Sequence, residues 1–230
     1  LSFAGTTAIL DGFEPVPGVR TIKEKFTSCY LVETRRGKVL LVDAGMDNKA
    51  EAIKKALAAW GLRADAVEAI LLTHGHSDHT GGVLAFPQAR VYALEADVPL
   101  VEGRAGSDSP MGRLMGAKPT GISVNKVIRD GQTIKIGNQT VRVYSVPGHT
   151  KGSAVYLVRG VLFMGDSADS LKQGGISGAK WLCSESRKVN HESLKALAVR
   201  VKDAGVKVLA FAHSGAVAGL KPLEDFAAKQ

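Results

Sequence analysis

Three of the six histidines in the chain fall within one six-residue segment, His74-Gly75-His76-Ser77-Asp78-His79. Imidazole is the commonest metal-binding side chain, and the carboxylate of Asp78 adds a second type of ligand to the segment. Because His74 and His76 are two residues apart, an extended backbone directs both side chains to the same side. We therefore expect this pair to bind one metal ion.

Asp78 and His79 are adjacent, so an extended backbone would direct their side chains to different sides. If the chain turns into a helix near Thr80, both side chains can face a second metal ion. This pattern differs from HExxH, in which two histidines four residues apart lie on one face of a helix. Three histidines and an aspartate in six residues favour metal binding over an exposed or structural role.

Four more ligand-type residues follow apolar segments that are predicted to form strands. They are Asp43 after residues 39–42, His149 after residues 140–146, Asp166 after residues 161–164 and His213 after residues 206–211. Rigid strands fix the loops at their ends, so residues from several strand ends can form one site. His191 lies at the start of a predicted helix without ligand-type neighbours, and we expect a structural role for it.

A catalytic metal ion needs about three protein ligands and an open position. The seven candidate ligands divide into two sets of three and one carboxylate that can bridge them: His74, His76 and His149; Asp78, His79 and His213; and Asp166. This division uses every histidine of the chain except His191.

Strands and helices along the chain are expected to position these residues. Apolar or alternating segments predict strands at residues 26–33, 39–42, 67–73, 90–94, 133–136, 140–146, 154–158, 161–164 and 206–211. Helical spacing predicts helices at residues 49–60 and 192–204, the second with Asn190 as its N-cap. Residues 102–125 are rich in glycine and proline, so we expect an irregular segment that flanks a site. The mixture favours sheets covered by helices over a β-barrel.

The composition, with 45% hydrophobic and 23% charged residues among 230, is that of a soluble globular protein. No apolar run is long enough to span a bilayer, so we expect no membrane partner. No linker or repeat divides the chain, which predicts one domain over residues 1–230. The net charge of +8 comes from scattered basic residues, which predict a solvated basic surface rather than a specific nucleic-acid partner; attraction of an anionic small-molecule substrate is the alternative.

The two cysteines and the first residue say little about the compartment. Cys29 and Cys183 lie far apart and outside any CxxC pattern, which predicts two separate thiols. The chain begins with Leu1, so both a cytoplasmic location and export after removal of a leader stay open.

The motifs around the candidate ligands resemble those of the metallo-β-lactamase-fold superfamily of hydrolases. The matching stretches are Thr73-His74-Gly75-His76-Ser77-Asp78-His79-Thr80-Gly81-Gly82, Pro147-Gly148-His149-Thr150-Lys151-Gly152-Ser153, Gly165-Asp166-Ser167, Ala212-His213-Ser214-Gly215 and Leu41-Val42-Asp43-Ala44-Gly45. Their order and spacing cover the chain from about Ser28 to His213. The resemblance implies an α/β fold, a four-layer αββα sandwich with its site at one edge of the two sheets, and the same division of ligands.

In this family pattern, Asp43 supports the ligand loop and does not bind the metal itself. A turn or N-cap aspartate is the alternative interpretation. His79 together with Asp166 differs from the true zinc β-lactamases, of which one branch has cysteine at the position resembling Asp166 and another lacks the bridging carboxylate. The set is more similar to glyoxalase II, lactonases and other dinuclear members. Ala-His-Ser-Gly replaces the Gly-His-Gly of many relatives, so we expect the loop at His213 to differ.

These observations predict a metal-dependent hydrolase of an ester, thioester or lactone. Two divalent ions, with zinc expected from the ligand types and iron or manganese as alternatives, would lower the pKa of a bridging water towards about 7. The resulting hydroxide would attack the substrate, and Asp78 would orient it or accept its proton. No substrate-binding residue is assigned; the candidates to line a pocket, each of which also fits ordinary surface or core, are Lys180, Trp181, Arg187 and residues 102–125.

Three other functions fit the same residues. Hydrolysis of a β-lactam, as a main or a side activity, is one of them, and a chromogenic cephalosporin assay would decide it. An iron-dependent persulfide dioxygenase carries a similar histidine set but uses one iron, so elemental analysis would separate it from a hydrolase. A non-catalytic binding protein can retain such a fold, but the complete ligand set argues against it.

Overall fold

The computed structural model describes residues 5–229, in which successive parts of the chain form two six-stranded sheets. The first sheet holds its strands in sequence order: β1 (Val19–Glu24), β2 (Thr27–Arg35), β3 (Lys38–Val42), β4 (Val67–Leu71), β5 (Arg90–Leu94) and β6 (Lys126–Ile128). Strands β1 to β3 are antiparallel, and β3 to β6 are parallel. The carboxyl ends of β3, β4 and β5 therefore meet at one edge of the sheet.

The second sheet has the order β14-β13-β10-β9-β8-β7 and is antiparallel except for the parallel pair β10 and β13. Its strands are β7 (Thr133–Ile136), β8 (Gln139–Ser145), β9 (Ala154–Val158), β10 (Val161–Phe163), β13 (Val208–Ala210) and β14 (Val217–Ala218). The chain also forms a short hairpin of β11 (Ala168–Ser170) and β12 (Ile176–Gly178).

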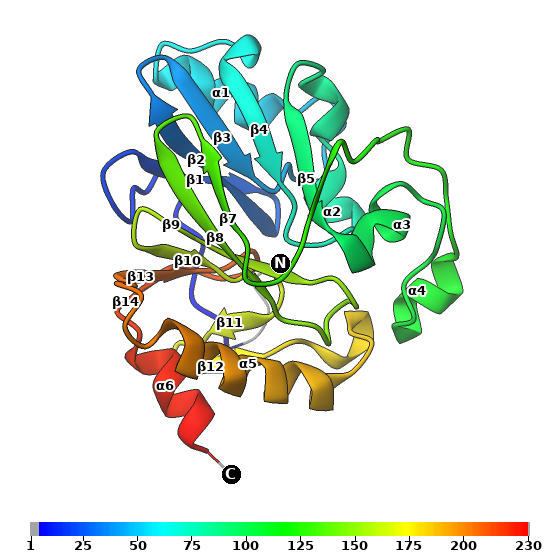
Figure 1. The fold of residues 1–230 in the computed structure, drawn as a ribbon, viewed down its shortest axis with the longest axis vertical. Helices are drawn as coiled ribbons and strands as arrows, with labels where there is room; N and C mark the ends of the chain where they lie inside the picture. Colours follow the sequence, from blue (N-terminus) through cyan, green and yellow to red (C-terminus); the bar gives the residue numbers. More distant parts are fainter. Residues whose placement is uncertain (1–4, 230) are drawn as a thin grey trace.

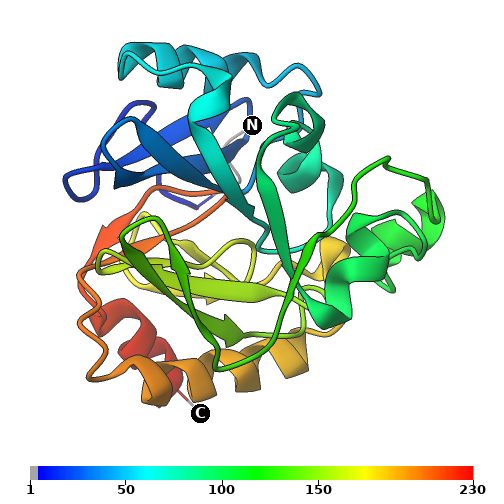
Figure 2. The same cartoon turned by 45° about the horizontal axis from the view of Figure 1, so that its top comes forward.

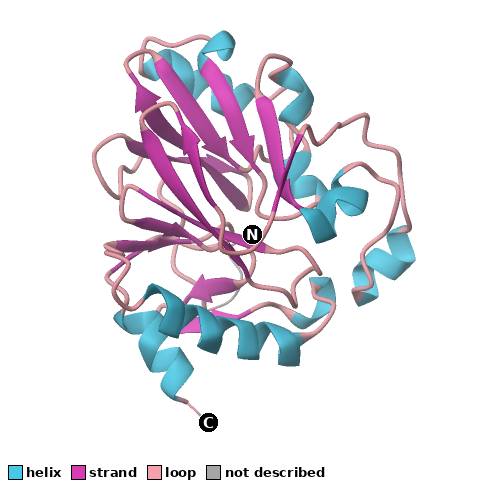
Figure 3. Ribbon diagram, in the orientation of Figure 1, coloured by secondary structure: helices cyan, strands magenta, loops and turns pink. Residues whose placement is uncertain are grey.

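Helices cover the outer faces of both sheets, so the molecule has four layers (Figures 1 and 2). The α-helices are α1 (Glu51–Ala59), α2 (Ser77–Thr80), α3 (Val98–Val101), α4 (Pro110–Met115), α5 (Arg187–Val201) and α6 (Lys221–Ala228). The 3-10 turns are η1 (Ala64–Ala66), η2 (Val83–Ala85), η3 (Glu95–Asp97) and η4 (Trp181–Cys183). Helix α1 lies outside the first sheet, whereas α5 and α6 lie outside the second (Figure 3). The predicted αββα sandwich is confirmed.

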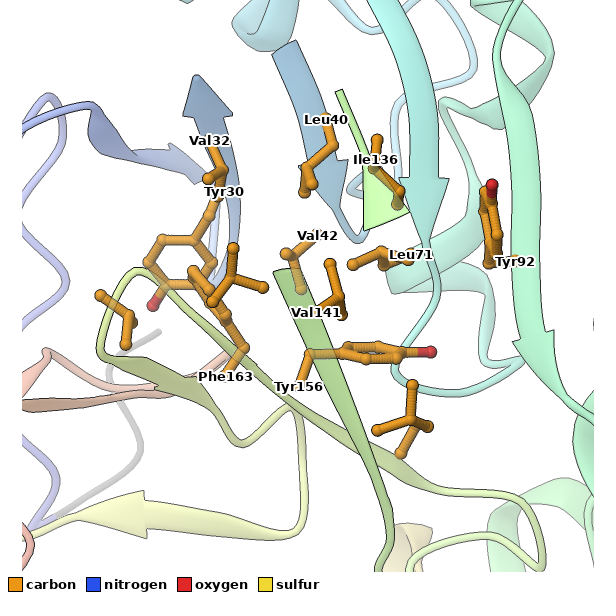
Figure 4. Close-up of a cluster of buried hydrophobic side chains, with 14 of the residues drawn as sticks. Tyr30, Val32, Leu40, Val42, Leu71, Tyr92, Ile136, Val141, Tyr156 and Phe163 are labelled. Atoms are coloured by element: carbon orange, nitrogen blue, oxygen red, sulfur yellow. The ribbon is translucent and has the colours of Figure 1, made fainter. Parts of the chain in front are cut away.

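Between the two sheets lies a core of interdigitated side chains, among them Leu40, Leu71, Tyr156 and Phe163 (Figure 4). Strand β3 shows why the sequence favours this arrangement. Its side chains alternate, so that Leu40 and Val42 enter this core while Val39 and Leu41 pack in a second cluster with α1. Both faces of the strand are thus covered, as its continuous apolar run predicts.

The observed elements follow most of the predictions but correct the start of the long helix. Helix α5 begins at Arg187, five residues before the predicted start, and the Ser186 hydroxyl caps it by accepting a hydrogen bond from the Val189 N–H at 3.2 Å. The predicted cap, Asn190, lies inside the helix. Its buried amide instead accepts a bond from the Ala179 N–H at 2.9 Å and donates one to the Ser167 carbonyl at 3.0 Å.

Several elements were not predicted, including β1, β6, β14 and α6. Residues 102–125 are mostly irregular, as expected, but contain α4. Cys29 and Cys183 are separate thiols, as predicted. Among residues 5–229, none of the helices combines the length and the apolarity that a bilayer span requires.

The revised roles of Ser186 and Asn190 predict different stabilities for their alanine variants. Ser186→Ala removes one exposed cap and should lower the free energy of unfolding by about 1 kcal/mol. Asn190→Ala leaves a buried N–H and a buried C=O without partners and should cost about 2–4 kcal/mol. Urea denaturation would measure both changes, and a cost for Ser186→Ala equal to or above that for Asn190→Ala would contradict this assignment.

Candidate metal centre

The segment that carries three of the histidines follows β4 and is held from behind by Asp43, at the end of β3. The Asp43 carboxylate accepts bonds from the Thr73 N–H at 2.8 Å and the Thr73 hydroxyl at 2.7 Å. It also accepts a bond from His79 Nδ1 at 2.8 Å. Asp43 has a φ of 60°, a left-handed conformation that aspartate tolerates better than most residues. One buried carboxylate therefore fixes both ends of the ligand segment.

Helix α2 begins at Ser77 and turns Asp78 and His79 away from the extended path of His74 and His76. Gly81, directly after the helix, lies against the backbone of the loop that follows Asp43. A Cβ atom at Gly81 would lie 2.5 Å from the Met46 carbonyl carbon and oxygen. The glycine therefore allows the helix to dock beside Asp43.

Three imidazole nitrogens converge on one point at the end of this segment. His74 Nε2 lies 3.0 Å from His76 Nδ1, and His149 Nε2 lies 3.1 Å and 3.0 Å from those two atoms. The Thr73 hydroxyl donates to Asp43, so His74 Nδ1, 3.1 Å from that hydroxyl oxygen, must donate to it. His74 Nε2 then carries a lone pair that faces the other two rings.

The other ring nitrogens of the remaining core histidines are also engaged. His149 Nδ1 lies 3.0 Å from the Ser184 hydroxyl oxygen, and His213 Nδ1 donates to the Phe26 carbonyl at 3.0 Å. His79 Nδ1 donates to Asp43, which leaves its Nε2 directed into the site. Outer hydrogen bonds of this kind set the tautomer and orientation of metal-binding histidines.

Asp166 stands between two groups of donor atoms. Its Oδ1 lies 3.2 Å from His79 Nε2, and its Oδ2 lies 3.1 Å from His213 Nε2 and 3.4 Å from His149 Nε2. Asp78 Oδ2 is 3.4 Å from His213 Nε2. Gly165 permits this placement, because it has a φ of 53° and a Cβ there would lie 2.7 Å from the Thr73 hydroxyl.

Burial and charge divide the histidines into two kinds. Burial lowers the pKa of His149 to about 3 and holds the pKa of His74 well below its ordinary value, with neighbouring imidazoles adding to the effect at His74. Burial also opposes protonation of His213, but the carboxylates of Asp166 and Asp78 outweigh it and raise the pKa to about 10. The imidazoles of His74 and His149 are therefore neutral at pH 7. His213, which lies beside two carboxylates, is protonated.

The donor set fits divalent metal ions. His74, His76 and His149 form one group, Asp78, His79 and His213 form a second, and within each group the ligand atoms lie within 4.8 Å of one another. Tetrahedral zinc with Zn–N distances of about 2.0–2.1 Å separates its nitrogens by about 3.3–3.4 Å, close to the spacing of the first group. His79 Nε2 and Asp166 Oδ1 are buried without a well-formed hydrogen bond to any described residue. Such an arrangement is costly unless a cation enters.

The structure thus brings together all seven candidate ligands, with Asp43 behind them. His191 lies apart from the donor groups, on α5, where its ring contacts Phe226 at a centroid distance of 4.8 Å. Lys180 forms an ion pair with Asp169, and Arg187 lines a different cavity, beside His191. Trp181 is 63% exposed. Residues 103–120 do line a cavity next to the donors.

Asp97, which sequence reasoning missed, connects the two ligand loops. Its buried carboxylate accepts bonds from the Gly75 N–H at 2.8 Å, the Gly152 N–H at 2.9 Å and the Thr150 hydroxyl at 3.0 Å. These donors flank His74, His76 and His149. The single sequence signal was an aspartate shortly after a predicted strand, at residues 90–94, which matches the pattern seen for the other site carboxylates.

Comparisons with known proteins agree with this geometry. The sequence model of the family described as "Metallo-beta-lactamase superfamily" matches residues 22–213. A hydroxyacylglutathione hydrolase of Aeromonas hydrophila subsp. hydrophila is 36% identical over 132 residues, which cover 56% of this chain and 41% of that protein. The uncharacterized protein YobT of Bacillus subtilis (strain 168) is 33% identical over 166 residues, which cover 67% of each chain. The chain thus spans less than half of the hydrolase that it matches.

Solved structures show the same fold. A metallo-beta-lactamase family protein from Thermus thermophilus superposes with a TM-score of 0.67 at 25% identity, over 94% of this chain and 80% of that one. A B3 metallo-beta-lactamase with an active-site glutamic acid gives a TM-score of 0.70 at 20% identity, over 99% and 87%.

The buried position of Asp97 predicts a pH-dependent contribution to stability. Burial raises the pKa of Asp97 from 3.8 to about 6, although its three hydrogen bonds oppose the shift. The folded protein therefore holds this proton more tightly than the unfolded chain. The stabilising contribution is present below pH 3.8 and is lost as the pH rises through about 6.

Asp97→Asn removes this titration. For the metal-free proteins, the free energy of unfolding of the unsubstituted chain minus that of Asp97→Asn should fall by roughly 2.4 kcal/mol between pH 4 and pH 7, since one pKa unit corresponds to 1.36 kcal/mol and the unfolded carboxyl is already partly ionised at pH 4. Urea denaturation at intervals of one pH unit would measure it. A difference that stays constant with pH, or that rises, would show that the Asp97 pKa is not raised.

Proposed function

The chain belongs to the metallo-beta-lactamase superfamily, and on this basis we propose that it is a metal-dependent hydrolase of an ester, thioester or lactone. One observation carries the proposal: the Asp166 carboxylate lies between two complete groups of donors, with its Oδ2 close to His149 Nε2 of the first group and to His213 Nε2 of the second. A single metal site would need only one of these groups. The arrangement therefore supports two divalent ions and a hydrolytic reaction.

We assign His74, His76 and His149 to one ion, Asp78, His79 and His213 to the other, and Asp166 to both. Imidazole and carboxylate donors favour zinc, and they also accept iron or manganese. Divalent ions bound there supply Lewis-acid polarisation of the attacked oxygen and activate water at neutral pH.

The residues of the chain set up the remaining steps. Asp78 lines the cavity next to the donors, so its carboxylate can orient the attacking water or take up its proton. Asp43 and Asp97 hold the ligand loops in place through six hydrogen bonds, which limits the reorganisation needed during the reaction.

The relatives support an acyl substrate. The similar hydroxyacylglutathione hydrolases are named for acting on an acyl derivative of a thiol, which is a thioester. The likeness to the B3 metallo-beta-lactamase concerns the fold alone, and nothing in the described residues favours a β-lactam over an ester.

Elemental analysis together with a panel of thioester, ester, lactone, β-lactam and phosphodiester substrates tests the proposal. We expect two divalent ions per chain, turnover of at least one acyl substrate, loss of turnover with a chelator and recovery when metal is returned. His79→Ala should lose one ion and lower kcat/KM at least about 100-fold, because it removes a ligand of the second group. His191→Ala, a histidine outside both groups, should retain metal content and activity. One iron per chain with oxygen consumption would overturn the proposal in favour of a dioxygenase.

Asp43→Asn should weaken metal binding without removing a ligand. The amide cannot accept all three hydrogen bonds from Thr73 and His79, so the ligand segment loses its fixed orientation, and affinity should fall about 10- to 100-fold. Competition with a chromogenic chelator measures this change. Glu24→Gln, at a buried carboxyl that accepts a bond from the Met46 N–H, is the matched control and should bind metal as before. Equal affinities in the two variants would refute the role of Asp43.

A further inference from the structure

A groove opens directly beside the candidate metal ligands and has a mainly apolar wall. Its volume is about 240 Å³. His76 and Asp78 line it together with residues of the segment that carries α4. The side chains of Leu100, Met111, Met115 and Cys183 contribute the apolar surface. We call this cavity the α4 groove.

Four of the five hydroxyl side chains that line the α4 groove take part in hydrogen bonds within the protein: Thr80, Ser107, Ser109 and Thr120. The Ser109 hydroxyl accepts a bond from the Gly112 N–H and caps α4, while the Ser107 hydroxyl accepts one from the Ser109 N–H. Apart from the two metal-ligand candidates, Lys118 is the charged residue among the described lining residues. The groove therefore offers a ligand mostly van der Waals contact.

Exposed apolar side chains gather around the outer end of this groove. Of the eleven large hydrophobic side chains exposed in residues 5–229, five lie on α4 and η4: Met111, Leu114, Met115, Trp181 and Leu182. Helix α4 contacts η4, and it projects from the side of the sandwich (Figures 1 and 2). Single exposed apolar residues are ordinary, but a gathered set indicates a binding surface.

The wall is tied to the ligand loops, so its position relative to the metal donors is set. Lys151, two residues after His149, pairs with Asp108 at 2.6 Å. The Glu185 carboxylate accepts a bond from the Asp108 N–H at 3.0 Å. Gly112 packs so tightly that a Cβ there would lie 2.5 Å from the Ser107 carbonyl oxygen.

We propose that the α4 groove binds an unbranched apolar acyl or alkyl group, so that the substrates are esters, thioesters or lactones of medium-chain acids. This proposal rests on the hydrolase function proposed above. A cavity of about 150 Å³ accommodates benzene, so about 240 Å³ accommodates roughly ten non-hydrogen atoms. Acyl chains up to about ten carbons should therefore fit.

A series of 4-nitrophenyl esters from acetate to dodecanoate, with the metal-loaded protein, tests the proposal. The kcat/KM should rise about two- to fourfold for each added methylene up to about ten carbons, the upper value corresponding to ~0.8 kcal/mol per buried methylene. Met115→Glu should lower the ratio of kcat/KM for decanoate to that for acetate at least about 100-fold, because it places a carboxylate in the groove. Met115→Leu should retain the ratio. Val199→Glu, at a 78% exposed apolar residue on α5, is the matched control and should leave the whole series unchanged.

Binding provides a readout that does not depend on turnover. The neutral probe 1-octanol, with nine non-hydrogen atoms, should bind the metal-loaded protein in isothermal titration calorimetry, with affinity reduced about tenfold or more by Met115→Glu but not by Val199→Glu. Turnover without a dependence on chain length overturns the groove assignment and leaves the hydrolase intact. Absence of all turnover refutes the hydrolase, and the probe then decides the groove separately. A dimer that Met115→Glu dissociates would mark the surface as an interface between copies and overturn the proposal.

Discussion

The Asp43 carboxylate is the constraint on which the site depends, because it accepts bonds from both Thr73 and His79. Its left-handed backbone costs about 1–2 kcal/mol. Each hydrogen bond to a charged acceptor returns about 1.5–3 kcal/mol, so three such bonds outweigh the strain. The same bonds direct His74 Nε2 and His79 Nε2 into the site. The donor groups are thus positioned by a carboxylate that is not itself among the candidate ligands.

Asp97 performs a related task between the two sheets. It joins the loop after β4, which belongs to the first sheet, to the loop before β9, which belongs to the second. The donors are main-chain N–H groups and a hydroxyl, so the contact fixes backbone positions as well as side chains. Together, Asp43 and Asp97 hold the two donor groups close to each other, even though the lone pairs of the donor atoms face one another.

Local patterns allowed much of this structure to be predicted from the sequence. The two-residue spacing of His74 and His76, and the ligand-type residues after apolar runs, were sufficient to group the donors, since strand ends meet at one edge. Asp97 was missed because its partners are main-chain groups, which leave no motif. Asn190 was misassigned as a cap because its tertiary bonds to Ala179 and Ser167 outweigh its local preference. Residues 102–125 line a cavity beside the donors, as expected, but the apolar character of that wall was not predicted, because these residues have no periodicity and only the folded chain shows which side chains face the site.

The division of the two sheets between successive parts of the chain has a consequence for folding. The first sheet and its loops supply His74, His76, Asp78 and His79. The second sheet and its loops supply His149, Asp166 and His213. An ion that binds donors from both layers acts as a non-covalent crosslink between them and cannot be held fully by either alone. Binding of such an ion then stabilises the folded state by mass action. Above the dissociation constant, the free energy of unfolding rises with the logarithm of the free metal concentration. The free metal concentration of the surroundings would in this way affect the stability of the fold as well as the chemistry of the site.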